Sequence, residues 1–361
     1  MKRTEVIGFI ISTCSYLRLS QAKTLSELVA AAMKLARASL AELGRALSYQ
    51  NSVATKHCIK RVDRFIGNHR IEPIEAMRAV VQYLAKPRKR LLVSIDWFDI
   101  RHFHCLLLAA RLHGRAVPLL WAVYRYEDFY RSQNNLEYGL LRVFRTMVPQ
   151  STEVVILADR GFGRAEMARQ CQKLGFSYII RVEPKAYIKA HGFAGNLNSL
   201  PIRPSGQMIL HNVLYRKQKP VTQHIAVVWR PGQPCPWFLM TNLERIRANK
   251  LTAVFGRRMS IEEYFRDAKN KRNGFALRLT MIKSSERLSR FLLILALAYI
   301  LLVTVGLYVR RHFRPKWWCS NNRVGECSLF TIGRVMLNTA LPSLNYLLRG
   351  LRNELLSENW G

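Results

Sequence analysis

The sequence predicts an α/β protein in which a mixed β-sheet carries helices on its faces and follows an all-α segment. Residues 1–85 show helical periodicity with almost no strand signal, and three apolar runs joined by tight turns come after them. Amphipathic helices then alternate with short apolar strands. A chain of 361 residues, 49% of them hydrophobic, is long and apolar enough to bury such a core without disulfides.

The N-terminal segment, residues 1–85, has the outline of a helical DNA-binding domain. Residues 24–47 are rich in Ala and Leu at helical spacing, residues 48–52 indicate a turn, and residues 55–66 form a second amphipathic helix. Helix, short turn and basic helix are typical of a helix-turn-helix, and a bundle helix with a solvated basic face fits equally well. The residues predicted to contact DNA are Lys60, Arg61 and Arg64.

The next segment supplies the sheet. The expected strands cover residues 91–100, 104–112, 116–124, 153–158 and 176–182, and the expected helices cover residues 134–148 and 164–174. In this order of elements the first and fourth strands usually lie side by side. Residues 90–182, together with residues 251–310, are the expected core.

Between the two parts of this core, residues 183–250 form a β-rich insertion. They contain seven of the 13 prolines, and strand-like pieces lie between them at residues 207–215, 224–229 and 237–241. A helix over residues 253–271 follows the insertion. Residues 311–361 are expected to be a helical C-terminal segment.

The charge restricts the partners of the protein. Its 57 Lys and Arg residues against 23 Asp and Glu give a net charge of +34, spread along the chain rather than held in a tail. Such a charge calls for a polyanionic partner, with nucleic acid as the first choice and an anionic membrane surface as the competitor. Seven Cys without a CxxC pair indicate reduced thiols and a cytoplasmic protein.

Residues 291–309 raise the question of a membrane. These 19 residues carry no charge and approach the length that spans a bilayer. Basic residues flank them on both sides, so they give no orientation bias. A single membrane anchor is one interpretation. We favour the other, a helix packed between the sheet and another domain.

Two carboxylates end apolar strands. Asp96 lies in the run 91–100, and Asp159 directly follows the strand 153–158. A carboxylate facing a crevice is costly unless it binds a cation, and Mg²⁺ is held by one or two carboxylates together with phosphate oxygens. If the two strands are neighbours, the two acids converge. For either residue alone, a helix cap or turn is the alternative.

A third group lies on the helix over residues 253–271. At about 100° per residue, Phe255, Arg258, Glu262 and Lys269 share one face, with Arg266 beside them. The face presents a carboxylate flanked by cations, next to an apolar stripe. A salt-bridged surface helix is the alternative, because Arg258 and Glu262 are an i,i+4 pair.

These residues carry a family resemblance. The spacing Phe255-x2-Arg258-x3-Glu262-x6-Lys269 resembles the Y-(2)-R-(3)-E-(6)-K signature of IS4-type DDE transposases, with Phe255 in place of Tyr. The lost hydroxyl puts one phosphate or water contact in doubt, but not the metal site. The resemblance covers residues ~90–310.

The first two acids of the family match as well. Asp96 in SIDW and Asp159 in ADRGF stand where the family has its first and second Asp. The resemblance implies an RNase H-like catalytic core with a β-insertion. It also implies two divalent ions, Mg²⁺ with Mn²⁺ as a substitute, held by Asp96, Asp159 and Glu262. Arg258 and Lys269 would hold phosphates, with Arg266 as a weaker candidate.

The implied reaction is hydrolysis of phosphodiesters at the terminal inverted repeats of an insertion sequence, followed by transfer of the freed 3′-OH. The implied partners are double-stranded transposon ends and target DNA, and the implied assembly is a homodimer on paired ends, associated with the nucleoid and not with a membrane. Relatives that cut through a DNA hairpin hold a flipped base on an aromatic ring. Trp229 or Trp237 could serve this role, and core packing is the alternative for each.

Other classes of protein remain open at this stage. An RNase H-like structure-specific nuclease without strand transfer would use the same carboxylates. A DNA-binding transposase descendant without activity would keep the basic charge, and so would a membrane-anchored basic protein.

Overall fold

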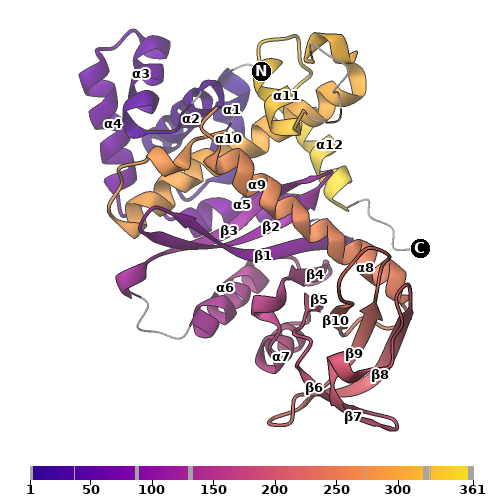
Figure 1. The fold of residues 1–361 in the computed structure, drawn as a ribbon. Coiled ribbons are helices and arrows are strands. Elements are labelled where there is room, and N and C mark those ends of the chain that lie inside the picture. The colour runs from indigo at the N-terminus through magenta and orange to yellow at the C-terminus, as the bar shows by residue number, and fades with distance from the viewer. Residues whose placement is uncertain are drawn as a thin grey trace.

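The computed structural model describes residues 3–35, 37–85, 89–128, 133–272, 274–319, 325 and 327–356. Figure 1 shows a group of N-terminal helices above a twisted sheet, further helices below the sheet, and a strand-rich extension at the opposite end. Most of the buried apolar residues form one continuous cluster that joins the N-terminal helices to the sheet. The mixed α/β architecture agrees with the predicted fold class.

The described part of the N-terminal segment is helical, as predicted. Its helices are α1 (Arg3–Thr13), α2 (Leu19–Lys34), α3 (Leu40–Asn51), α4 (Thr55–Gly67) and α5 (Pro73–Leu84). The predicted single helix over residues 24–47 is wrong, because a new helix begins where Ser39 caps α3 by accepting a hydrogen bond from the Glu42 amide.

The helix-turn-helix outline is present in α3 and α4. Only residues 52–54 separate the two helices, and Ser52 adopts the left-handed conformation with φ 52°. The helices approach closely at Gly44, where an added Cβ would lie 2.4 Å from the Ile59 side chain. A glycine is therefore required at this crossing.

The sheet has ten strands in the order β3-β2-β1-β4-β5-β10-β9-β8-β6-β7. Its first five strands are β1 (Arg90–Ile100), β2 (Phe103–Leu112), β3 (Arg115–Arg125), β4 (Glu153–Ala158) and β5 (Ser177–Arg181). β1 pairs antiparallel with β2 and parallel with β4. The predicted neighbourhood of the first and fourth strands is confirmed.

The strands of the predicted insertion continue the same sheet. They are β6 (Tyr187–Ala190), β7 (Phe193–Asn196), β8 (Gln207–Tyr215), β9 (Val221–Val228) and β10 (Trp237–Thr241). β10 pairs antiparallel with β5, and this pairing attaches the insertion strands β6–β10 to the core strands. The short hairpin β6–β7 was not predicted.

Helices cover both faces of the sheet. α6 (Gln133–Met147) and α7 (Ala165–Lys173) lie on one side, and α8 (Ala248–Gly256) and α9 (Ser260–Lys269) run diagonally across the other (Figure 1). The predicted continuous helix over residues 253–271 is wrong. A 3₁₀ turn, Arg257–Met259, separates α8 from α9 and carries Arg258.

The apolar run 291–309 lies within α10 (Ser285–His312). This helix is long and apolar enough to cross a bilayer, yet 94% of its most apolar window is buried inside the protein. It packs against β3, against α2, α4 and α5, and against the C-terminal helices α11 (Leu329–Val335) and α12 (Leu344–Leu356). The interpretation as a packed core helix is confirmed for the described residues.

Glycines bring α10 close to another helix. An added Cβ at Gly306 would lie 1.9 Å from the Leu329 carbonyl oxygen. Gly333 makes the reciprocal approach to the Leu302 carbonyl oxygen. These two glycines therefore set the crossing of α10 with α11.

Candidate active site

Strand register brings two carboxylates to the same level. In the parallel pair of β1 and β4, Ile95 lies opposite Ala158, so the next residues, Asp96 and Asp159, lie level with each other. Asp159 also caps the 3₁₀ turn Arg160–Phe162, with its Oδ1 accepting a hydrogen bond from the Gly161 amide at 2.8 Å. The predicted convergence is present, and so is the cap that was its alternative.

Glu262 reaches this pair from α9. Burial raises the pKa of Asp96 to about 6, Arg258 and the Trp97 amide oppose the shift, and the negative charges of Asp159 and Glu262 add to it. Asp96 thus lies within electrostatic reach of both other acids. The Asp96 side chain is 15% exposed and the Glu262 side chain 44%, so the cluster opens toward solvent on the α9 side.

Arg258 lies between two of the acids. Its Nη1 is 2.9 Å from Asp96 Oδ2 and 3.8 Å from Glu262 Oε1, and its side chain is only 12% exposed. Within the described parts of the chain, no group of three or more His, Cys, Asp or Glu side chains is already arranged so that it could hold a metal ion. Three carboxylates have the oxygen donors that Mg²⁺ prefers, and Arg258 supplies the positive charge that they require here.

Lys269 and Arg266 differ in position. Lys269 Nζ lies 5.5 Å from the ring centres of Phe98 and Phe265, and burial lowers the pKa of Lys269, while Asp99 and Glu262 counteract the shift. Lys269 therefore lies near the carboxylates. Arg266 instead pairs with Glu263 at 3.0 Å and is 68% exposed.

The three basic residues that were predicted to contact DNA from α4 also differ from one another in exposure and in partners. Lys60 and Arg64 are exposed. Arg61 is half-buried, with Nη1 2.7 Å from Glu27 Oε2, and it donates a hydrogen bond to Thr24 Oγ1 of α2. Arg61 thus holds α4 against α2, a role that the basic face of one helix cannot reveal.

A pocket of 280 Å³ adjoins Asp159. Its other lining residues are Arg160, Arg181, Trp237, Phe255, Gly256, Arg258 and Met259. The Arg181 guanidinium lies 5.3 Å from the Trp237 ring centre, and Phe255 meets that ring edge-on at 5.6 Å. Trp229, in contrast, donates its indole hydrogen to the Gln233 carbonyl within its own turn and does not line this pocket.

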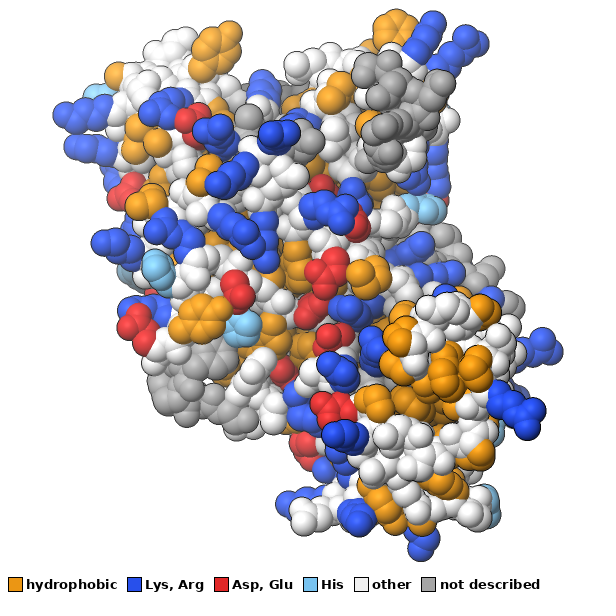
Figure 2. All heavy atoms as spheres, in the orientation of Figure 1, with side chains coloured by type: hydrophobic (Ala, Val, Ile, Leu, Met, Phe, Trp, Pro, Cys, Tyr) orange, Lys and Arg blue, Asp and Glu red, His pale blue; other side chains and the backbone are white. Residues whose placement is uncertain are grey.

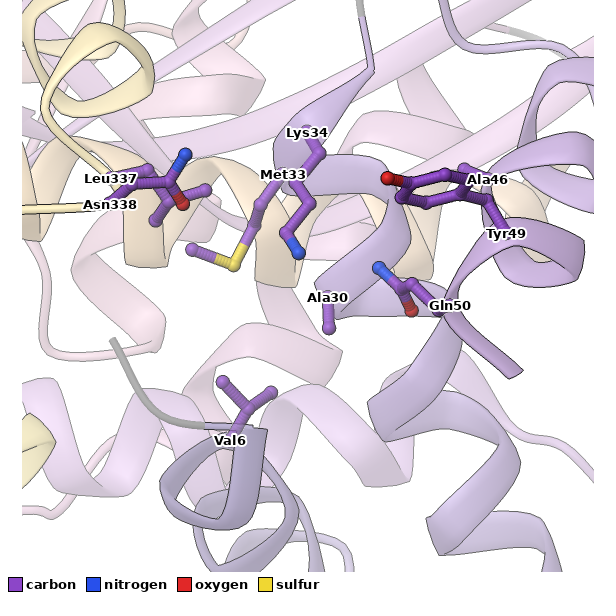
Figure 3. Close-up of a pocket in the computed structure, with 9 residues that line it drawn as sticks. All are labelled: Val6, Ala30, Met33, Lys34, Ala46, Tyr49, Gln50, Leu337 and Asn338. Carbon is purple, nitrogen blue, oxygen red and sulfur yellow. The ribbon is translucent and has the colours of Figure 1, made fainter. Parts of the chain in front are cut away.

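A larger hollow of 660 Å³ lies elsewhere, between the N-terminal helices and the segment after α11 (Figure 3). Apolar side chains such as Val6, Met33 and Leu337 form much of its wall. None of its lining residues comes from β1, β4 or α9. It is not connected with the carboxylates.

The sequence interpretation missed a buried acid on the opposite face of β1. Glu137 of α6 is 1% exposed and accepts a hydrogen bond from Trp97 Nε1 at 3.0 Å. It also pairs with Arg164. A detectable signal existed, because Glu137 occupies the apolar stripe of α6, in line with Leu141 and Phe144. The pocket residues Arg160 and Arg181 were missed as well.

Exposed side chains carry charges of both signs. Figure 2 shows Lys and Arg side chains spread over this face, with Asp and Glu side chains interspersed among them along its middle. A long polyanion could contact basic side chains at several places on this face.

The comparison with known families agrees with this geometry. Residues 128–301 match the family model of the transposase DDE domain. The match supports a DDE transposase, and domains of this kind use divalent metal ions and act on DNA. It includes Asp159, Arg258, Glu262 and Lys269, whereas Asp96 lies upstream of it. No curated protein matches the chain at a significant level.

Proposed function

We propose that the protein is an IS4-type DDE transposase, which cuts and joins DNA at the terminal inverted repeats of an insertion sequence. One observation carries the proposal: the register of β1 and β4 sets Asp96 level with Asp159 beside Glu262, in a chain that matches the transposase DDE domain. The spacing from Phe255 to Lys269 supports the IS4-type assignment.

Asp96, Asp159 and Glu262 are the residues that would hold the divalent ions, Mg²⁺ or Mn²⁺. When bound, two such ions activate the attacking oxygen and stabilise the leaving oxygen of an in-line displacement at phosphorus. The described acids fit this role by their chemistry. Asp96 Oδ2 contacts Arg258 in the structure, so this oxygen would have to be free of that contact to hold an ion.

The cations around the acids then bind the substrate. Arg258 is the closest, and after leaving Asp96 it can take up a phosphate of the scissile strand, for which its planar guanidinium is well suited. Lys269, held over two aromatic rings, provides a second positive charge. Arg160 and Arg181 line the adjoining pocket and extend the phosphate contacts beyond Asp159.

Purified protein and the end DNA of the flanking element provide the test. With Mg²⁺, we expect cleavage that frees a 3′-OH, joining of that end to a target, and loss of both reactions in EDTA. An assembled complex should contain two protein chains and two DNA ends. Cleavage without joining would identify an RNase H-like nuclease and reject the transposase.

We expect α4 to supply much of the sequence preference for the ends. The change Lys60→Ala with Arg64→Ala removes two exposed cations and should lower the ratio of end affinity to random-DNA affinity about 10-fold, since a lost base contact costs ~1–3 kcal/mol. Fluorescence anisotropy at fixed salt measures the ratio. The full chain is required, because the N-terminal helices share a core with the sheet.

The matched control is Lys185→Ala with Lys189→Ala, which removes two exposed cations near and in β6. This control should weaken binding to both DNAs alike and leave the ratio unchanged. An unchanged ratio in the α4 variant would show that the helix-turn-helix outline is only a bundle with a solvated basic face.

Trp237 is the better of the two candidates for holding a flipped base, because it lines the pocket beside Asp159. Stacking contributes ~1–3 kcal/mol per base, so Trp237→Ala should slow cleavage roughly 5- to 100-fold and Trp237→Phe much less. 2-Aminopurine at the cleaved end reports stacking by its fluorescence. If Trp229→Ala has the larger effect on this signal, the assignment to Trp237 is wrong.

A further inference from the structure

On the face of the sheet that α6 covers, a chain of hydrogen bonds connects β1, which carries Asp96, with the turn that follows β4 and Asp159. Trp97, the residue after Asp96, donates its indole hydrogen to Glu137 Oε1 at 3.0 Å. The other oxygen of Glu137 accepts from Arg164 Nη2. Arg164 Nη1 donates to the Gly161 carbonyl at 2.5 Å, and the Gly161 amide donates to Asp159 Oδ1 at 2.8 Å.

The pairing of β1 with β4 stops just short of the acids. Its last pair is Ile95 with Ala158, where β4 ends, whereas β1 continues beyond Asp96 in its pairing with β2. Asp159 therefore lies beyond its strand, where it caps the turn Arg160–Phe162 by accepting a hydrogen bond from the Gly161 amide. A side-chain connection from β1 to this turn adds to the connection made by the strand pairing.

Glu137 provides such a connection, because it bonds both Trp97 and Arg164. Its side chain is 1% exposed and comes from α6, on the face of β1 opposite to Arg258. A buried carboxylate is costly unless its hydrogen bonds and its charge are satisfied. Here both oxygens are engaged, one by Trp97 of β1 and one by Arg164, which also bonds the turn after β4. These bonds are not the only contacts of α6 with the rest of the protein, because its Leu140, Leu141 and Phe144 side chains are buried as well.

We propose that Glu137 and Arg164 are positioning residues that set the distance between Asp96 and Asp159 for binding divalent ions. The inference rests on the proposed function and deepens it. Neither side chain is a metal ligand in this proposal. They act through Trp97 and Gly161, and groups that orient metal ligands in this way commonly change metal affinity about 10- to 100-fold when they are replaced.

The test uses the full chain and the Mn²⁺ ion alone as the probe. Glu137→Gln keeps the size of the side chain and an oxygen for Trp97, but it removes the charge that Arg164 binds. We expect its affinity for Mn²⁺, measured by electron paramagnetic resonance of the unbound ion, to fall about 10-fold or more. The Mg²⁺ concentration for half-maximal cleavage should rise by a similar factor.

The matched control is Glu166→Gln on α7. Glu166 also pairs with an arginine, Arg169, at 2.8 Å, but its side chain is 45% exposed. Its described hydrogen bonds stay within α7 and involve neither β1 nor the turn after β4. It should bind Mn²⁺ as the wild type does. End-DNA affinity in EDTA should be unchanged in both variants. A merely structural role for Glu137 would instead lower thermal stability and leave Mn²⁺ affinity of the folded protein intact.

A second variant covers the case in which Glu137→Gln does not fold. Trp97→Phe removes the N–H donor and replaces the indole by a smaller aromatic ring at the position where Trp97 stacks on His104 at 4.4 Å. It should also weaken Mn²⁺ binding. Wild-type Mn²⁺ affinity in either folded variant overturns the proposal.

Asp96→Ala separates this failure from failure of the proposed function. If Asp96→Ala loses Mn²⁺ binding and Glu137→Gln keeps it, the positioning role alone is wrong. If the wild type and Asp96→Ala bind Mn²⁺ equally, the metal site itself is wrong, and the positioning role fails with it.

Discussion

Replacement of Asp96, Asp159 or Glu262 by Ala, one at a time, is expected to lower Mg²⁺-dependent cleavage of end DNA by at least about 10³-fold. Residues that hold the same ions act as a unit, so the triple variant should lose no more than each single variant. Binding to end DNA in EDTA should persist, because the exposed cations that contact DNA are unchanged. Gel-resolved cleavage and anisotropy measure the two properties separately.

Asp96 is the most informative of the three. It lies outside the segment that matches the transposase DDE domain, and its assignment depends on strand register and on its electrostatic coupling to the other acids. Asp99 and Glu263 are matched controls. Asp99 pairs with His104 at 2.6 Å and Glu263 with Arg115 at 2.9 Å, so Asp99→Ala and Glu263→Ala should keep cleaving. Substantial cleavage by Asp96→Ala would remove this residue from the site.

Much of this site was predictable because it depends on local patterns. Each of β1 and β4 contains an apolar run that is followed directly by an aspartate, and the order of elements makes the two strands neighbours. Their pairing then places Asp96 level with Asp159. No tertiary detail was required for this step.

The parts that were not predicted depend on contacts between distant segments. Helical periodicity continues through Arg257–Met259, so it does not reveal the 3₁₀ turn between α8 and α9. The partner of Arg61 is Glu27 on another helix, and the partner of Glu137 is Arg164 beyond the next strand. Gly306 meets α11 and not the sheet, which no spacing within α10 could indicate.

The burial of α10 predicts a second large effect. Leu295, 2% exposed, lies within this helix, which packs against β3, the N-terminal helices and the C-terminal helices at once. Leu295→Asp places a carboxylate there, and the cost of an unpaired buried charge is about 3–5 kcal/mol, a large share of the 5–15 kcal/mol that stabilises a typical domain. We expect loss of the cooperative unfolding transition in circular dichroism and loss of cleavage.

Leu19→Asp is the matched control, since Leu19 is 57% exposed at the first position of α2 and the same substitution there should change stability little.

Wild-type protein should stay in solution at high salt without detergent, after nucleic acid has been removed. A membrane anchor would behave differently in both experiments. It would require detergent at every salt concentration, and a protein lacking residues 291–309 would still show the unfolding transition of its catalytic region. Because α10 packs against the sheet and against both groups of helices, we expect that deletion to abolish the transition.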